Sequence, residues 1–145
     1  MSTSITKDAL ADLTLQELLI RIIQTQTAKA IDDGLVTDPK NPITQVVEFI
    51  RSNLKENFSM KHLSEKACMS TTSFYRFFKR ELGMSPIEFV IGEKMRCAKQ
   101  LLKNPSIQIN EVCYLSGFQD CNYFIRLFKK HEGITPKQYQ LLFVN

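Results

Sequence analysis

The feature that most constrains the fold of this chain is a stretch of sequence that occurs twice. The stretch SFYRFFKRELGMSP (73–86) returns as YFIRLFKKHEGITP (123–136), with Phe, Arg, Phe, Lys, Gly and Pro at matching positions. A basic residue follows the Lys in both copies. Self-similarity of this kind is typical of a structural unit that is used more than once. The sequence therefore predicts two copies of one unit within 145 residues.

Each copy has the pattern of a helix-turn-helix unit. A short helix (MKHLSEKA or INEVCYLS) leads into a tight turn (CMS or GFQD), and a longer helix follows at 71–82 or 121–132. The second turn has one extra residue, so the offset between the copies is 49 before the turn and 50 after it. Two helix-turn-helix units in one chain are therefore expected.

The rest of the chain also predicts helices. No hairpin turn sequence and no sustained alternation indicates a strand. Helix-capping residues and Pro divide the part after residue 42 into seven helices, of which the first is expected at 43–57. The predicted fold class is all-α, with two helix-turn-helix subdomains of the homeodomain-like, three-helix type. A long central helix at 86–104 joins them, and an amphipathic N-terminal helix precedes them.

The N-terminal helix is expected at 14–30. A polar segment at 30–42, with one Gly and two Pro, separates residues 1–40 from a domain at 41–145. An apolar stripe at helical spacing consists of Leu15, Leu18, Leu19, Ile22 and Ile23. One helix cannot bury this stripe by itself, so a second copy of the chain or the chain's own helical domain must cover it. The polar linker favours the second copy, which would make a homodimer.

The two longer helices present similar outer faces. Phenylalanines four residues apart mark the inner face of each helix, namely Phe74, Phe78, Phe124 and Phe128. The outer faces hold side chains of the types that read DNA grooves. They are Thr71, Thr72, Tyr75, Arg76, Lys79, Cys121, Asn122, Ile125, Arg126 and Lys129. We therefore interpret both helices as recognition helices.

Individual roles follow from side-chain chemistry. Arg forms two hydrogen bonds with a guanine edge, Asn does so with adenine, and Thr or Ile contacts a thymine methyl group. We expect Arg76 and Asn122 to read bases. Lys79 and Lys129 lie one turn further along their helices, where a cation suits the phosphate backbone. The predicted partner is double-stranded DNA.

Charge and spacing agree with this partner. Residues 1–40 carry four basic and six acidic side chains, whereas residues 41–145 carry fifteen and nine, so the positive charge lies in the helical domain. A helix at 86–103 would be about 27 Å long at 1.5 Å per residue. With the helix diameters added, it can hold two recognition helices near one DNA turn, roughly 34 Å apart. One chain can then enter two successive major grooves.

The repeated region resembles the DNA-binding domain of AraC/XylS-type bacterial transcription regulators. The resemblance covers about 43–143 and is most specific in Gly-Phe at 117–118, Tyr-Phe…Arg…Phe-Lys at 123–129 and Gly-x-Thr-Pro at 133–136. Gln140 departs from the Arg that usually follows the final Tyr, and we expect it to weaken one surface or backbone contact. Cys121 and Ile125 are less polar than is usual, so the second helix is expected to contribute less hydrogen-bonded specificity.

The resemblance implies a sequence-specific transcription regulator, with RNA polymerase as a further partner if it activates. Such regulators join this domain to a sensing or dimerising domain. Residues 1–40 are then either the remnant of a sensor domain or part of a naturally short regulator, and the apolar stripe favours the remnant.

Other function classes lack support in the sequence. It has no nucleophile–base signature, no Gly-rich phosphate loop and no zinc or CxxC spacing among its four cysteines, which predicts a protein that is not an enzyme and needs no cofactor or metal. No apolar run is long enough for a membrane helix. We expect a cytoplasmic, nucleoid-associated protein with reduced thiols. The alternative is a helical protein-interaction module, which would have apolar outer faces and little salt dependence.

Overall fold

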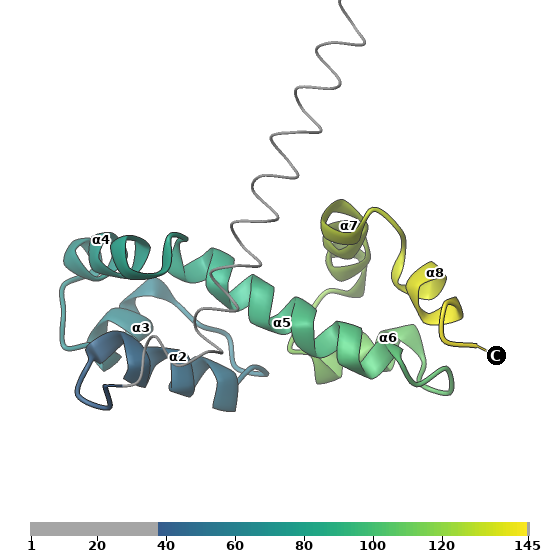
Figure 1. Ribbon diagram of the computed structural model, residues 1–145, viewed down its shortest axis with the longest axis horizontal. Helices are drawn as coiled ribbons and strands as arrows, with labels where there is room; N and C mark the ends of the chain where they lie inside the picture. The colour runs from purple at the N-terminus through teal and green to yellow at the C-terminus, as the bar shows by residue number, and fades with distance from the viewer. Residues whose placement is uncertain (1–37, 145) are drawn as a thin grey trace, which may run out of the picture.

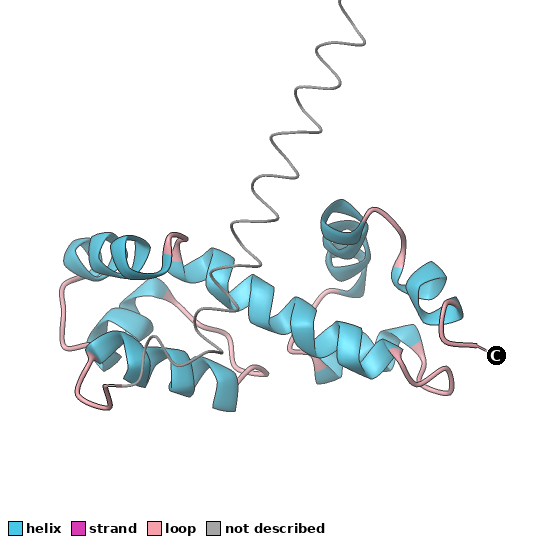
Figure 2. Cartoon of the chain, in the orientation of Figure 1, coloured by secondary structure: helices cyan, strands magenta, loops and turns pink. Residues whose placement is uncertain are grey.

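A computed structural model describes residues 38–144, and this part of the chain is all helical, without a strand (Figure 2). The helices are α2 (Pro42–Ser52), α3 (Met60–Lys66), α4 (Thr71–Leu82), α5 (Pro86–Leu102), α6 (Ile109–Leu115), α7 (Cys121–Glu132) and α8 (Pro136–Leu141). The predicted fold class is confirmed for these residues. The predicted N-terminal helix at 14–30 lies outside the described residues.

Two separate hydrophobic cores form the two units. The first core lies among α2, α3, α4 and the start of α5, and it contains Ile43, Val46, Val47, Ile50, Phe58, Leu63, Ala67, Phe74, Phe78, Leu82, Phe89 and Val90. The second lies among the rest of α5, α6, α7 and α8, and it contains Met95, Ala98, Leu102, Val112, Cys113, Phe118, Phe124 and Phe128. Helix α5 runs across the molecule and supplies residues to both cores (Figure 1).

The predicted caps begin and end the helices. The Ser70 hydroxyl accepts a hydrogen bond from the Ser73 N–H at 3.2 Å, and the Asp120 carboxylate accepts from the N–H groups of Asn122 and Tyr123. Capping boxes begin α5 and α8. These side chains satisfy N–H groups that have no partner within a helix, so local sequence places the helix starts.

Helix α2 is shorter than predicted. It ends at Ser52 instead of continuing to residue 57, because Asn53 leaves helical geometry and its side-chain amide donates a hydrogen bond to the Phe49 carbonyl at 2.8 Å. The chain then turns before Phe58 enters the first core. This turn positions Leu54, whose carbonyl group lies at the boundary between the two units.

The two helix-turn-helix turns are closed by equivalent backbone hydrogen bonds. The Met69 N–H donates to the Ser64 carbonyl, and the Phe118 N–H donates to the Cys113 carbonyl, each at 3.0 Å. The residue before each donor has a positive φ, which is 55° at Cys68 and 95° at Gly117. The extra residue of the second turn follows Phe118.

Gln140 holds α8 against the loop after α5. The residue is 1% exposed, and its amide nitrogen donates hydrogen bonds to the carbonyl groups of Asn104 at 3.1 Å and Ile107 at 2.7 Å. Lys137 in turn donates to the amide oxygen of Gln140 at 3.2 Å. The side chain of Gln140 is therefore buried and contacts two backbone carbonyl groups. The expected weakening of one surface or backbone contact relative to Arg stays a prediction.

Candidate nucleic-acid interface

Pairs of phenylalanines anchor the two longer helices, as the sequence predicts. Phe74 and Phe78 of α4, and Phe124 and Phe128 of α7, have no exposed surface. The ring centroids within each pair are 5.5 Å and 5.8 Å apart. Because residues four apart lie on the same side of a helix, these pairs turn the remaining faces of α4 and α7 outward. The anchors therefore set which side chains are available to a partner.

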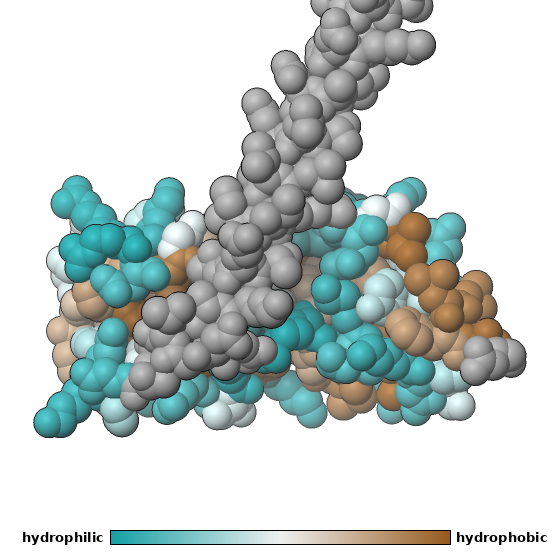
Figure 3. Space-filling model, viewed as in Figure 1, coloured by the Kyte–Doolittle hydropathy of each residue, from teal (hydrophilic) through white to brown (hydrophobic). Residues whose placement is uncertain are grey.

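In the first unit all five predicted site residues are exposed, and they are Thr71, Thr72, Tyr75, Arg76 and Lys79. The ammonium nitrogen of Lys79 lies 5.9 Å from the Tyr75 ring centroid, within cation–π range. No ion pair found among residues 38–144 involves Arg76. The surface over α4 is largely hydrophilic (Figure 3). This helix thus presents a polar and basic face to solvent.

The second unit exposes only part of its predicted set. Asn122, Arg126 and Lys129 are exposed on α7. Cys121 and Ile125 are half-buried and pack against the second hydrophobic core. Burial therefore explains the apolar residue at position 125, and a contact of Ile125 with a thymine methyl group stays a prediction. The exposed cations remain in register with those of the first unit.

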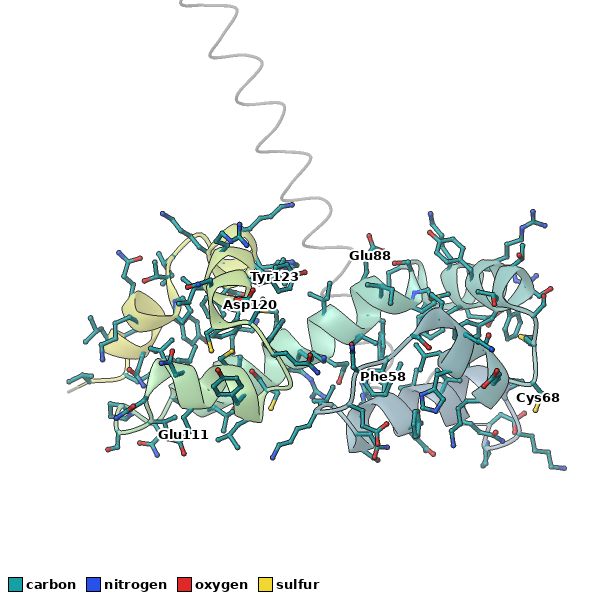
Figure 4. All side chains as sticks on the ribbon, turned by 180° about the vertical axis from the view of Figure 1, so that it is seen from behind. Phe58, Cys68, Glu88, Glu111, Asp120 and Tyr123 are labelled. Carbon is teal, nitrogen blue, oxygen red and sulfur yellow. The ribbon has the colours of Figure 1, made fainter. Side chains whose placement is uncertain are left out.

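Tyr123 belongs to the exposed face of α7 and was not among the predicted site residues. Its side chain is 43% exposed, next to Asn122 at the start of the helix, and Figure 4 places it beside Asp120. The repeat concealed it, because the equivalent position in the first unit is Ser73. A Tyr directly after Asn122 and before the inward Phe124 is the sequence signal that would have found it, because Tyr is enriched at interfaces.

A second basic residue follows the predicted phosphate-binding Lys in each longer helix, namely Arg80 after Lys79 and Lys130 after Lys129. Arg80 pairs with Glu81 at 3.5 Å, and its guanidinium lies 5.0 Å from the Phe77 ring centroid. Arg80 nevertheless remains largely exposed, as does Lys130 at the equivalent position of α7. We predict that Arg80 and Lys130 are surface or phosphate-facing charges and do not read bases.

The cysteines of residues 38–144 show no metal chemistry. No group of three or more His, Cys, Asp or Glu side chains in this part of the chain can hold a metal ion. Burial raises the pKa of the Cys113 thiol to about 12, with contributions from Cys121 and Asp120, so this thiol stays protonated at neutral pH. Burial also raises the pKa of Cys97. Cys113 therefore behaves as a small core side chain, whereas Cys97 is half-buried.

The two outer faces lie at opposite ends of one helix. Figure 1 shows α4 and α7 on the same side of α5, each near one of its ends. Helix α5 has 17 residues and is therefore about 25 Å long. None of the helices in residues 38–144 is long and apolar enough to cross a membrane. Two similar faces, each with an exposed Arg and an exposed Lys at matching positions, are thus joined by one continuous element.

Comparison with known proteins identifies this arrangement. A family model described as a helix-turn-helix domain matches residues 63–141, which is more than half of the chain. The chain is an AraC-type helix-turn-helix protein. The AraC-type family consists of transcription regulators and is not an enzyme family.

Solved structures share the fold of this AraC-type domain. The C-terminal domain of the two-component response regulator yesN from Fusobacterium nucleatum is 32% identical in sequence. Its superposition has a TM-score of 0.65 and covers 70% of this chain and 99% of that one. The DNA-binding domain of AdpA, described as a global transcriptional factor and solved with a target DNA, is 26% identical, with a TM-score of 0.68 over 72% of this chain and 94% of that one.

A curated relative is much longer than this chain. The xylose operon regulatory protein of Escherichia coli K12 is 26% identical over 129 residues, which cover 89% of this AraC-type chain and 32% of that protein. The chain thus spans about a third of the length of that relative. Activities of the unmatched two thirds of that protein do not transfer to this chain.

Proposed function

We propose that this chain regulates transcription by binding duplex DNA sequence-specifically, with α4 and α7 in two successive major grooves. The observation that carries the proposal is the matched pair of outward faces, with Arg76 and Lys79 on α4 and Arg126 and Lys129 on α7, at the two ends of α5. A helix fits the major groove of B-DNA, and Arg is its commonest reader of guanine. The AdpA structure, which contains DNA, supports the same use of this fold.

The two faces are proposed to divide the work of recognition. Arg76 and Asn122 read base edges, Lys79 and Lys129 hold phosphates, and Thr71 with Thr72 contributes hydroxyl and methyl contacts. Cys121 and Ile125 support α7 from its half-buried side, so they contribute less to hydrogen-bonded readout. Phosphate contacts set the register of the protein on the duplex, whereas base contacts supply the preference for a sequence.

Selection of bound duplexes from a random DNA pool tests this proposal most directly. We expect two preferred blocks of bases about one helical turn apart, and footprinting should protect about two turns. Binding should weaken steeply with salt, because neutralised phosphates release counterions. A single preferred block, together with a second unit that can be deleted at no cost in affinity, would contradict the use of two grooves. Salt-independent binding of a protein partner would favour the interaction-module alternative.

We further propose that the segment at 14–30 associates with a second copy of the chain. The sequence pattern supports this proposal, because its apolar stripe needs a cover. Two copies would raise the effective concentration of one DNA-binding domain at a second site. Sedimentation should give a dimer for the intact chain and a monomer for Leu18→Glu/Ile22→Glu. The control Gln24→Glu/Ala28→Glu adds the same charge on the opposite face of the expected helix and should stay dimeric. If the intact chain and both variants are monomers, the chain's own domain is the cover.

We also propose that the protein acts in the bacterial cytoplasm, at the nucleoid, and that contact with RNA polymerase mediates any activation. The membership of the family of transcription regulators supports this. Transcription with purified RNA polymerase, from a template that carries the selected site, tests it. More transcript with the protein than without it would support activation through the polymerase, whereas less would identify a repressor.

A further inference from the structure

The second turn packs directly on the first unit at Gly117. This residue is buried, has φ of 95°, and directs its missing side chain at the backbone of Leu54, in the loop after α2. A Cβ atom at Gly117 would overlap the Leu54 carbonyl oxygen and lie 2.8 Å from the carbonyl carbon. Glycine is therefore required twice, once by the backbone angle and once by the close approach of the two units.

Lys94 of α5 completes this contact. Its ammonium nitrogen donates a hydrogen bond to the Gly117 carbonyl at 2.8 Å and lies 5.8 Å from the Phe118 ring centroid. The charge is partly removed from water, which lowers the pKa of Lys94. A hydrogen bond from a charged donor is stronger than a neutral one, so this bond holds the turn onto α5. We call Leu54, Lys94 and Gly117 the junction.

The residue before Lys94 attaches α5 to the first unit. Glu93 is buried and accepts hydrogen bonds from Arg51 at the end of α2, at 3.1 Å and 3.5 Å, and from Arg96 at 2.8 Å. Consecutive helical residues point about 100° apart. Neighbouring side chains in the middle of α5 therefore hold different units, Glu93 the first and Lys94 the second.

The junction lies immediately before the second recognition helix. Only Phe118 and Gln119 separate Gly117 from Asp120, the cap that begins α7. Phe118 is buried in the second core, so a shift of Gly117 would carry the start of α7 with it. We propose that the junction sets the distance between α4 and α7 and thereby determines which spacing of two half-sites the protein accepts on DNA. Leu54, Lys94 and Gly117 are positioning residues that touch no base, and this inference rests on the proposed function.

A spacing series tests the inference. The two base blocks obtained by selection are placed on duplexes with the preferred spacing and with one to five base pairs added or removed. Gly117→Ala is expected to lower affinity at the preferred spacing by at least about tenfold, because simultaneous engagement of both sites depends on geometry. It should flatten or shift the spacing profile. Affinity for a duplex that carries the first block alone should stay unchanged.

The chain offers a matched control for each change. Gly133 has φ of 81° and open space around its missing Cβ, so Gly133→Ala introduces similar backbone strain without touching the first unit. Lys94→Met removes the hydrogen bond to Gly117 and keeps the apolar stem, and Lys103→Met removes one exposed charge from the end of α5. We expect Lys94→Met to flatten the spacing profile and both controls to leave it unchanged.

A measurement without DNA separates the two proposals. Spin labels at Arg80→Cys and Lys130→Cys, with Cys68, Cys97 and Cys121 replaced by Ala, report the distance between α4 and α7. We expect one narrow distribution, broadened or shifted by Gly117→Ala and by Lys94→Met. If Gly117→Ala does not fold, Lys94→Met decides. If the folded variants keep the wild-type distance and the wild-type spacing profile, the proposed role of the junction is wrong. If the variants change the distance as expected but the protein does not bind DNA, only the proposed function is wrong.

Discussion

The two helix-turn-helix units share one backbone plan and differ in what they show to solvent. In the first unit, Thr71 and Tyr75 are exposed, whereas their equivalents in the second, Cys121 and Ile125, are half-buried against the core. The matching Arg and Lys remain exposed in both units. The two units therefore share the exposed cations and the fold, whereas α4 exposes more of the polar side chains that we propose to read DNA.

The turns differ in their surroundings. Cys68 and Gly117 occupy equivalent turn positions and both have a positive φ. Cys68 is exposed at the outer end of the first unit (Figure 4), whereas Gly117 is buried at the junction. The first turn tolerates a side chain because Cys68 is exposed to solvent. The second unit therefore contains the glycine that positions one unit against the other. The first unit exposes more hydrogen-bonding side chains on its longer helix.

The largest expected effect concerns the two aromatic anchors. Phe78→Ala and Phe128→Ala should each lower the free energy of unfolding by about 3–5 kcal/mol, because each leaves a cavity in its own core. Since α5 contributes to both cores, urea unfolding followed by circular dichroism should remain a single transition. The control Tyr75→Ala alters an exposed residue and should change the free energy of unfolding by no more than about 0.5 kcal/mol. Two separate transitions would show that the units are energetically independent.

A second test concerns Gln140, whose equivalent in the first unit is the buried Val90. Gln140→Val should cost about 2–4 kcal/mol of stability, because the Asn104 and Ile107 carbonyls both lose their donor. The control Gln100→Val alters an exposed glutamine of α5 and should change stability by no more than about 0.5 kcal/mol. Thermal unfolding measures both. Equal stability of Gln140→Val and the wild type would mean that a buried apolar residue serves equally well in both units.

A third test compares base reading in the two units. Arg76→Ala should weaken binding to the selected site by about 1–3 kcal/mol and relax the preference at one base pair. Arg80→Ala removes the same charge from the same helix and should weaken all sequences alike. Lys79→Ala should do likewise and reduce the salt slope by about one. Fluorescence anisotropy across single-base variants distinguishes these outcomes, and an equal loss on every variant for Arg76→Ala would remove its reading role.

The same binding assay, applied to Arg126→Ala, measures how much α7 contributes to base preference compared with α4. We expect a smaller relaxation of base preference than for Arg76→Ala, because its half-buried neighbours Cys121 and Ile125 offer fewer polar contacts. A larger relaxation would reverse the assignment of the main reading role to α4.

The smallest expected effect concerns the turn at Cys68. Its φ of 55° is unfavourable for a residue with a Cβ, so Cys68→Gly should raise the free energy of unfolding by about 1 kcal/mol. Cys68→Ala removes the thiol and keeps the strain, so it should give no gain. Urea denaturation compares the two, and equal stabilisation by both variants would assign the effect to the thiol instead of the backbone angle.

Much of this architecture was predictable from short stretches of sequence. Caps such as Ser70 and Asp120 lie next to the helices they begin, and Gly83 and Gly133 end α4 and α7 in left-handed geometry. Phenylalanines at a spacing of four placed both inner faces correctly. These features depend on neighbours within a few residues, so the sequence alone determined the number, order and inner faces of the helices after residue 42.

Only the tertiary structure decided which outward positions remain open. The half-burial of Cys121 and Ile125, the buried amide of Gln140 and the packing of Gly117 on Leu54 all involve partners distant in sequence. Sequence periodicity assigns a residue to a face of its own helix, but it does not show what another element places against that face. The physical reason is that helix starts and periodicity are local properties, whereas burial and the relative position of two units arise from contacts across α5.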